Sequence, residues 1–470
     1  MPVSEGVMRP AEPPKAPPKA SLKSRTLRAG GWTVVAHLAG QVLRLVSSLV
    51  MTRILVPEMF GVMAIAIVVQ VIVALLSDIG LRQAIVQNPR GNAPEFLDTA
   101  WSLQVVRGWI IWAVCALIGL AMFALARSGW APVGTVYAVA VLPAIIASTA
   151  LSSAINGFAS TKVLTANREL DMSKVTRIEL IAQLSGLLLM FAIGWLTRSI
   201  WSVVAGVLLT SLVSVALSHG WLKGHRNRFR FDPGCVKEIV AFGRWIFVSS
   251  ALGVLAINGD RLFLGVWLSA SLLGIYAIAL NLTTVVEGLA YKLFGTVSFA
   301  VFSEAHRDTP GRLRELFFRM RLPADVVFLA AAGFLYGAGQ LIVDLLYDHR
   351  YAEAGAMLQI LSFGLFFTRY SLSGSLYVAL GKPQYQTVVQ VMNIVSMFAL
   401  IPTLYALYGV PGAIWAVALY RLPSSIAVLV FNRRHGLQSA LFEFAVLPAW
   451  GAGWALGWGL SQLVHHGHPA

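Results

Sequence analysis

The sequence places six basic side chains inside long apolar stretches, where a charge is hardest to accommodate. They are Arg44, Arg107, Arg261, Lys292, Arg369 and Arg421. Hydrocarbon cannot solvate a guanidinium or ammonium group, so in a membrane such side chains face protein or a water-filled cavity. Arg107 and Lys292 lie close enough to the ends of their stretches to extend toward the membrane surface. Arg44, Arg369 and Arg421 lie near the centres of their apolar stretches, too far from either end to reach the membrane surface easily.

Acidic residues that could neutralise these cations are few. Asp260 lies near one end of its apolar stretch, and Glu287 lies midway through the next. Because the interior cations outnumber these two acids, we expect some cations to bind an anionic ligand. The candidates for that anion site are Arg44, Arg261, Arg369 and Arg421. In the alternative interpretation, each arginine pairs with an acid and only joins helices. The two acids, Glu287 and Asp260, could be counter-ions of this kind or relays for protons or sodium ions.

Polar side chains form stripes along several apolar stretches. In the first stretch they recur every three or four residues and fall within about 100° of one another on a helix. They are Thr33, His37, Gln41, Arg44, Ser48 and Thr52. This stripe predicts one wall of a hydrated passage. Gln386, Gln390 and Asn393 share a face further on, and such amides suit sugar hydroxyls but also join helices within membranes.

Motifs for covalent chemistry are absent from the sequence. It contains no phosphate-binding GxxxxGK[ST] loop, no HExxH and no nucleophile elbow. Its two cysteines, Cys115 and Cys235, fit neither a disulfide framework nor a metal site, and the histidines near the C-terminus are typical of a mobile tail. We therefore expect no enzymatic activity, no metal and no cofactor.

The bulk composition is that of a membrane protein with many spans. Of the 470 residues, 57% are hydrophobic and only 12% charged, whereas soluble domains are nearer a quarter charged. Thirteen apolar segments are long enough, or nearly so, to cross a bilayer. They are 32–55, 59–80, 100–126, 133–157, 175–196, 199–221, 245–268, 272–302, 322–347, 355–380, 385–407, 411–431 and 442–464.

Basic residues are concentrated in alternate connectors between these segments. The net charge of +15 therefore indicates membrane topology rather than binding to nucleic acid. Because basic connectors face the cytoplasm, the N-terminus is predicted to be cytoplasmic, and an odd number of spans places the C-terminal tail outside.

A weak internal repeat divides the chain into two similar halves. The sequence FGVMAIA at 60–66 opens the second apolar segment, and LGIYAIA at 273–279 opens the eighth. Two six-helix lobes meeting at a central passage would follow, as in many transporters. We expect an all-α polytopic protein with a disordered basic tail at 1–28, lobes at 29–222 and 245–432, a basic linker at 223–244, and an extra helix and tail at 433–470.

Several blocks of sequence resemble the polysaccharide transporter family, which includes O-antigen and exopolysaccharide flippases. The most specific block is the first connector, Arg53-Ile-Leu-Val-Pro57-Glu58-Met-Phe60-Gly61. The blocks 78–87 and 96–101 match its second span and first cytoplasmic loop, and 258–276 is similar to its seventh and eighth spans. That family belongs to the superfamily of multidrug, oligosaccharidyl-lipid and polysaccharide exporters, which also contains the lipid II flippase.

The resemblance implies a fold, a substrate and a cycle. Members have two six-helix lobes around a central cationic cavity whose access alternates between the two sides of the membrane. The implied cargo is an oligosaccharide repeat unit on undecaprenyl diphosphate, whose diphosphate arginines could hold by paired hydrogen bonds. The implied partners are this lipid-linked oligosaccharide, membrane lipid and proteins of polysaccharide polymerisation and assembly, with no nucleic acid.

Three other functions fit part of the sequence. A multidrug extruder of the same fold would expel organic cations, which an arginine-lined cavity should repel. A membrane-embedded ligase that joins glycans to lipid usually carries a large outer loop, whereas the outer connectors here are short. A scaffold of a polysaccharide-assembly complex is the third.

Overall fold

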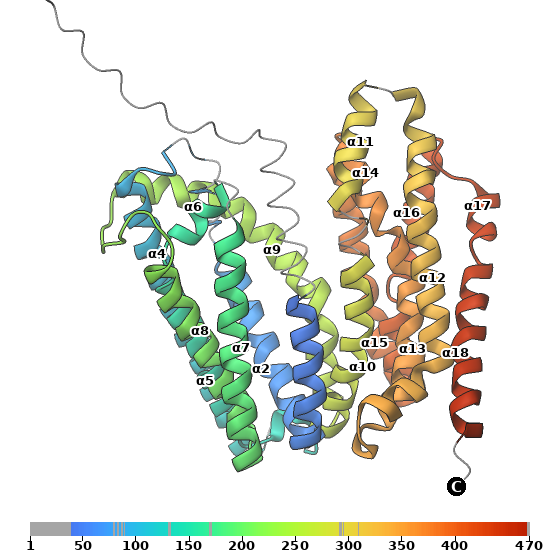
Figure 1. Ribbon diagram of the computed structural model, residues 1–470, viewed down its shortest axis with the longest axis horizontal. Coiled ribbons are helices and arrows are strands. Elements are labelled where there is room, and N and C mark those ends of the chain that lie inside the picture. Colours follow the sequence, from blue (N-terminus) through green and yellow to red (C-terminus); the bar gives the residue numbers. More distant parts are fainter. Residues whose placement is uncertain are drawn as a thin grey trace, which may run out of the picture.

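The computed structural model shows helices throughout the part of the chain that it describes. The described residues are 39–78, 80–81, 84–85, 88, 90–129, 133–168, 172–290, 294, 296–308 and 310–467. Within these ranges there is no β-strand, and the helices form two lobes that stand side by side (Figure 1). Eight of the described helices are long and apolar enough, by length and composition, to cross a membrane. The predicted all-α polytopic fold is confirmed.

The N-terminal lobe matches the first six predicted segments closely. Residues 39–54 are helical and are followed by α2 (Pro57–Leu76), α4 (Pro94–Arg127), α5 (Leu142–Gly157), α7 (Met172–Thr197) and α8 (Trp201–Gly220), with the short helices η1 (Val136–Ala138) and α6 (Lys162–Arg168) between them. The largest difference is in the fourth segment, predicted to begin at residue 133. Its helix begins only at Leu142, because Gly134 has a positive φ of 83° and η1 occupies the intervening stretch.

The C-terminal lobe is more broken than the sequence predicted. It contains α9 (Pro233–Trp267), α10 (Ala270–Ala290), α11 (Thr296–Asp308), α12 (Leu313–Leu346), α13 (Glu353–Thr368), α14 (Leu372–Ala379), α15 (Pro383–Leu419) and α16 (Leu422–Arg434), with the single turns η3 (Pro310–Arg312), η4 (His349–Tyr351) and η5 (Arg369–Ser371). The predicted eighth segment is two helices, α10 and α11, and the tenth is interrupted by η5. Gly409, with φ 64°, kinks α15 between the predicted eleventh and twelfth segments.

The internal repeat explains how the two lobes meet. A Cβ atom on Gly61 of α2 would lie 1.9 Å from the Ala270 carbonyl oxygen of α10. A Cβ on Gly274 of α10 would lie 2.0 Å from the carbonyl oxygen of Pro57 in α2. The repeat aligns Gly61 with Gly274 and Pro57 with Ala270, so equivalent residues make reciprocal contacts. Only glycine allows the two backbones to approach this closely.

Further contacts between the lobes lie at one end of the molecule. Tyr351 of η4 donates a hydrogen bond to the Leu55 carbonyl at 2.9 Å, and Arg350 donates to that of Thr52 at 3.0 Å. The Val136 amide donates to the Leu268 carbonyl at 3.1 Å. The basic connector 221–232, the start of α12 and the end of α16 all lie at the other end, which we call the basic end (Figure 1).

The last predicted segment forms α17 (Ala440–Ala445) and α18 (Pro448–Gly467), and α18 packs along α12. The contact is again made through glycines. Gly333 of α12 lies against the backbone of Trp450, and Gly337 lies against that of Trp454. Residue numbers therefore rise together along both helices, and α18 runs from the basic end to the opposite end beside α12 (Figure 1).

Candidate functional site

A cavity of about 870 Å³ lies within the C-terminal lobe, between α9, α10 and the helices from α13 to α16. Its apolar wall is interrupted by many polar groups. The polar lining includes Asp260, Arg261, Thr283, Thr284, Glu287, Thr368, Gln386, Gln390, Asn393, Arg421, Ser424 and Ser425. Of the residues proposed from the sequence, the cavity brings together Arg261, Arg421, Asp260 and Glu287. The amides that share one face of α15 also line the cavity, so their spacing in the sequence did indicate part of this site.

The centre of the cavity wall is an ion pair between Arg421 and Glu287. Arg421 Nη1 lies 2.7 Å from Glu287 Oε1, and the Thr368 hydroxyl donates to the same oxygen at 2.8 Å. Arg421 also donates through Nε to the Tyr420 hydroxyl at 2.9 Å. The side chains are 29% and 26% exposed. Glu287 therefore acts as a counter-ion in this structure, while its arginine remains accessible from the cavity.

Asp260 and Arg261 occupy another part of the same wall. One carboxylate oxygen of Asp260 accepts a short hydrogen bond from the Tyr276 hydroxyl. Its other oxygen, Oδ1, is buried and has no hydrogen-bond partner among the described residues. Arg261 donates to Asn258 Oδ1 at 3.3 Å. A buried carboxylate oxygen without a donor is a place where a hydrogen-bond donor or a cation could bind.

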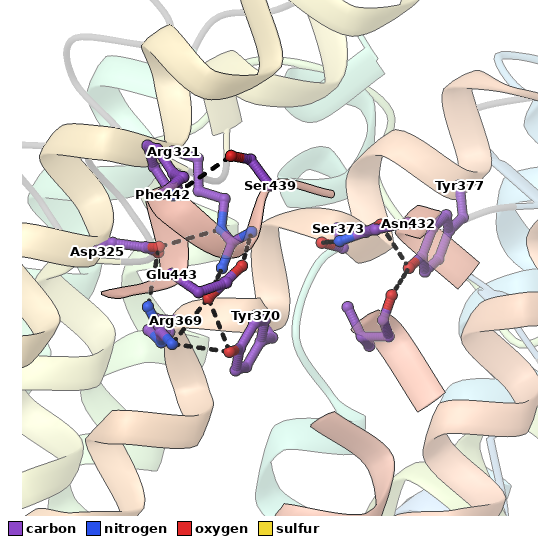
Figure 2. Close-up of polar contacts among 11 residues, drawn as sticks. Arg321, Asp325, Arg369, Tyr370, Ser373, Tyr377, Asn432, Ser439, Phe442 and Glu443 are labelled. Carbon is purple, nitrogen blue, oxygen red and sulfur yellow. Dashed lines mark hydrogen bonds and ion pairs between the residues drawn. The ribbon is translucent and has the colours of Figure 1, made fainter. Parts of the chain in front are cut away.

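Arg369 lies outside this cavity, in a buried cluster with Arg321, Asp325 and Glu443 (Figure 2). It is 3% exposed, with Nη1 3.3 Å from Asp325 and Nη2 2.9 Å from Glu443. Arg321 lies 3.0 Å from Asp325 and 2.6 Å from Glu443. The Tyr370 hydroxyl accepts from Arg369 and donates to Glu443. Two cations and two acids thus form one closed, neutral group.

Within the C-terminal lobe, this cluster supplies two acids that the sequence analysis did not count. Among the described residues of the C-terminal lobe, four buried or cavity-lining arginines face four acids. The arginines are Arg261, Arg321, Arg369 and Arg421, and the acids are Asp260, Glu287, Asp325 and Glu443. Asp325 and Glu443 both fall inside predicted apolar segments, near their ends, so the sequence did contain the missing acids.

The remaining predicted site residues lie elsewhere. Arg44 is exposed and Gln41 half-buried on the helix 39–54, and neither lines the C-terminal cavity. His37 lies outside the described residues, as does Lys292. The first-connector block is at the junction of the lobes: Pro57 and Gly61 are buried, and Phe60 packs edge-on against Tyr351. Arg53 and Glu58 are exposed there.

A second, smaller cavity of about 530 Å³ lies in the N-terminal lobe and is lined by Asp78, Gln104 and Arg107, among others. Arg107 is bound to the backbone of the neighbouring helix α2. Its Nε donates to the Ser77 carbonyl at 2.8 Å and its Nη2 to that of Ala74 at 2.7 Å. These carbonyls belong to the C-terminal end of α2, where the helix leaves its acceptors free and a cation is stabilised.

Solved transporters of one superfamily share this fold. A multidrug resistance MATE family transporter of the MOP superfamily, in an inward-facing conformation, aligns with a TM-score of 0.63 at 15% identity, over 86% of this chain and 95% of that one. The lipid II flippase MurJ, in an inward closed conformation, aligns with a TM-score of 0.62 at 12% identity, over 94% and 99%. At such identities the likeness establishes the fold alone.

The sequence comparisons identify the family. A family model described as polysaccharide biosynthesis protein matches residues 50–356, more than half of the chain, and the chain therefore belongs to that family. Lipopolysaccharide biosynthesis protein WzxC of Escherichia coli (strain K12) is 25% identical over 346 residues, 73% of this chain and 67% of the relative. Succinoglycan biosynthesis transport protein ExoT of Rhizobium meliloti (strain 1021) is 22% identical over the same proportions. The expected resemblance is confirmed.

Proposed function

We propose that this multi-pass membrane protein moves undecaprenyl-diphosphate-linked oligosaccharide units across a bacterial inner membrane by alternating access. The observation that carries the proposal is Arg421, a guanidinium accessible from a polar cavity that is large enough for part of a sugar head group. The family and the names of its relatives support polysaccharide biosynthesis as the process. No covalent step is needed, so the protein acts as a transporter and not as an enzyme.

The chemistry of the cavity suits such a cargo. A diphosphate can accept paired hydrogen bonds from Arg421 and would replace Glu287 as its partner. Hydroxyls and amides along α15 and α16 suit the sugar units, while the prenyl chain can remain in lipid. Glu287 keeps the empty cavity electrically balanced, and Asp260 is our candidate for coupling to a proton or a cation. Arg44, Gln41 and His37 stay predicted contributors to the passage.

A cation extruder is the second candidate, and one observation favours it. The C-terminal cavity holds two acids, Asp260 and Glu287, as well as two arginines, so its charge alone would not repel an organic cation. The two functions separate in a deletion strain. Loss of the exporter abolishes polysaccharide at the surface under our proposal, whereas loss of an extruder increases sensitivity to cationic drugs and leaves the polysaccharide unchanged.

Substitution of Arg421 tests the proposed anion site. Arg421→Ala removes a charge-assisted contact worth about 1.5–3 kcal/mol, which corresponds to roughly 10- to 150-fold in affinity. We expect polysaccharide export to fall accordingly and lipid-linked units to accumulate, with partial activity in Arg421→Lys. Export is measured in complemented deletion cells and normalised to protein in the membrane. The matched control is Arg127→Ala, which removes an exposed arginine at the C-terminal end of α4, outside the cavity. Normal export by Arg421→Ala would refute the role.

The proposed orientation places the basic end and the N-terminus in the cytoplasm. Cys235 is a poor reporter because it is 3% exposed and burial raises the pKa of its thiol, so little reactive thiolate forms. Arg226 is exposed in the connector 221–232. In a Cys115→Ser, Cys235→Ser background, Arg226→Cys should react with a membrane-impermeant maleimide only after permeabilisation. Labelling of intact cells would invert the orientation.

A further inference from the structure

The connector 221–232 carries an unusual alternation of arginine and phenylalanine. The residues are Arg226, Asn227, Arg228, Phe229, Arg230 and Phe231, which we call the basic-aromatic strip. All three arginines are exposed, and Phe229 and Phe231 are 63% and 55% exposed. Adjacent exposed phenylalanines mark a surface that contacts something other than bulk water.

The strip is fixed in place by its backbone. The Arg228 amide donates to Asp98 Oδ1 at 2.9 Å, the Arg230 amide to Ser102 Oγ at 2.9 Å, and the Asp232 amide to Thr99 Oγ1 at 3.2 Å. Every second amide is therefore bound to the first turns of α4. This holds the chain along the lobe, with its three arginines exposed.

The depth of the strip is set by the helix to which it is bound. Its anchors, Asp98 to Ser102, lie where the apolar segment of α4 begins, at the basic end (Figure 1). The Phe229 ring lies 4.6 Å from that of Trp101, whose indole N–H donates to the Phe158 carbonyl at 3.3 Å. Aromatic side chains with such polar contacts are typical of the membrane–water boundary. The strip therefore lies beside the start of the apolar part of α4, a level that in a membrane corresponds to the lipid head groups.

The charge of the strip is only partly neutralised. Arg230 pairs with Glu95 at 2.9 Å, and both groups are about half exposed. Arg226 and Arg228 have no acidic partner among the described residues. Guanidinium groups at this depth match the phosphates of lipid head groups, and phenylalanines beside them match the upper acyl chains.

We propose that the basic-aromatic strip is a binding surface for anionic phospholipids of the surrounding leaflet. Arg226 and Arg228 hold phosphate groups, and Phe229 and Phe231 contact acyl chains. This surface lies on the outer flank of the N-terminal lobe and is separate from the C-terminal cavity. Whether this surface binds phospholipid therefore does not depend on which substrate the protein transports.

A lipid titration of the purified full-length protein tests the charge requirement. Phosphatidylglycerol is added to protein in a zwitterionic detergent, and retained lipid is counted by native mass spectrometry. We expect Arg226→Gln/Arg228→Gln to weaken binding by roughly 25-fold, about fivefold for each arginine, with no change toward phosphatidylcholine. Arg314→Gln/Arg319→Gln removes two exposed arginines at the same end and serves as the control for net charge. Equal phosphatidylglycerol binding by the strip variant and this control would overturn the proposal.

A photocrosslinker identifies the occupant directly. Benzoylphenylalanine in place of Phe231 is irradiated in native membranes, and the mass of the adduct is determined. A phospholipid adduct that disappears in the Arg226→Gln/Arg228→Gln background supports the proposal. An adduct with the mass of a prenyl carrier, an adduct with another protein, or a phospholipid adduct unchanged in that background would refute it.

Discussion

Two arginine sites in the C-terminal lobe look equivalent in sequence and differ in the structure. Arg369 and Arg421 both lie near the centres of apolar segments, and both are bound to acids. Arg369 is 3% exposed in a closed group of two cations and two acids, whereas Arg421 and its single partner are more than a quarter exposed to a cavity. Depth within a segment therefore does not distinguish the arginine that lines the cavity from the one that is buried. The packing of α17 separates the two arginines, because its Glu443 completes the buried cluster at Arg369.

The difference in burial predicts a difference in energetics. Ions removed from water are stable only when every charge is compensated, so deleting one partner of a buried group costs about 3–5 kcal/mol. An ion pair in contact with water contributes about 0–1 kcal/mol, because solvent screens it. The Arg369 cluster should therefore determine whether the lobe folds, and the Arg421 pair should determine what the cavity binds.

The largest effect is expected for Glu443→Gln. This change leaves Arg321 and Arg369 with one acid between them, and we expect a loss of about 3–5 kcal/mol in the free energy of unfolding. The measurements are protein level in membranes and thermal unfolding in detergent. Adding Arg369→Met should restore much of the stability, because Arg321 and Asp325 then remain as a 3.0 Å pair. Glu315→Gln, at a 59% exposed side chain, is the matched control. Wild-type stability of Glu443→Gln would contradict the comparison.

Particular residues show which features of the structure could be predicted from the sequence and which could not. Periodicity and loop charge predicted the helices, and the FGVMAIA and LGIYAIA blocks predicted two similar halves, but the close contact of Gly61 with α10 is seen only in the structure. A local pattern cannot show that Glu443 packs against Arg369, 74 positions earlier, because only the docking of α17 and α18 on α12 brings them together. The cavity within one lobe was likewise not predicted, since its lining comes from α9, α10 and the helices from α13 to α16, which only the tertiary fold brings together.

A smaller effect on folding is expected for Glu287→Gln at the cavity. Both side chains of the pair with Arg421 are more than a quarter exposed, so the free energy of unfolding should change by no more than about 1 kcal/mol. Arg421 would lose its counter-ion, and inorganic diphosphate should then bind about three- to tenfold more tightly. Thermal shift with diphosphate measures both quantities, with Thr284→Ala in the same cavity wall as the control. A loss of stability as large as that of Glu443→Gln would remove the distinction between the two sites.

The smallest effect is expected at an ion pair outside the membrane-spanning segments, between Asp348 and Arg350 of η4. The side-chain hydrogen bond from Arg350, whose Nε lies 2.9 Å from Asp348 Oδ2, lowers the pKa of Asp348. Because the pKa is lower in the folded protein than the value of about 3.9 for a free aspartate, this stabilisation is present above that pH. It is lost as the pH falls through the folded value. The side chains are 20% and 31% exposed, so the contribution should be below about 1 kcal/mol.

Comparison with Asp348→Asn isolates that contribution. The difference in unfolding free energy between wild type and variant should be constant from about pH 5 to pH 7 and should shrink below about pH 4, as the wild-type carboxylate becomes protonated. Chemical unfolding of the purified protein in detergent at several pH values measures this difference. Arg350 also donates to the Thr52 carbonyl across the junction of the lobes, so Arg350→Gln should remove the same pH dependence and weaken that contact as well. A difference that grows as the pH falls would mean that Asp348 is destabilised by its surroundings, which would contradict the prediction.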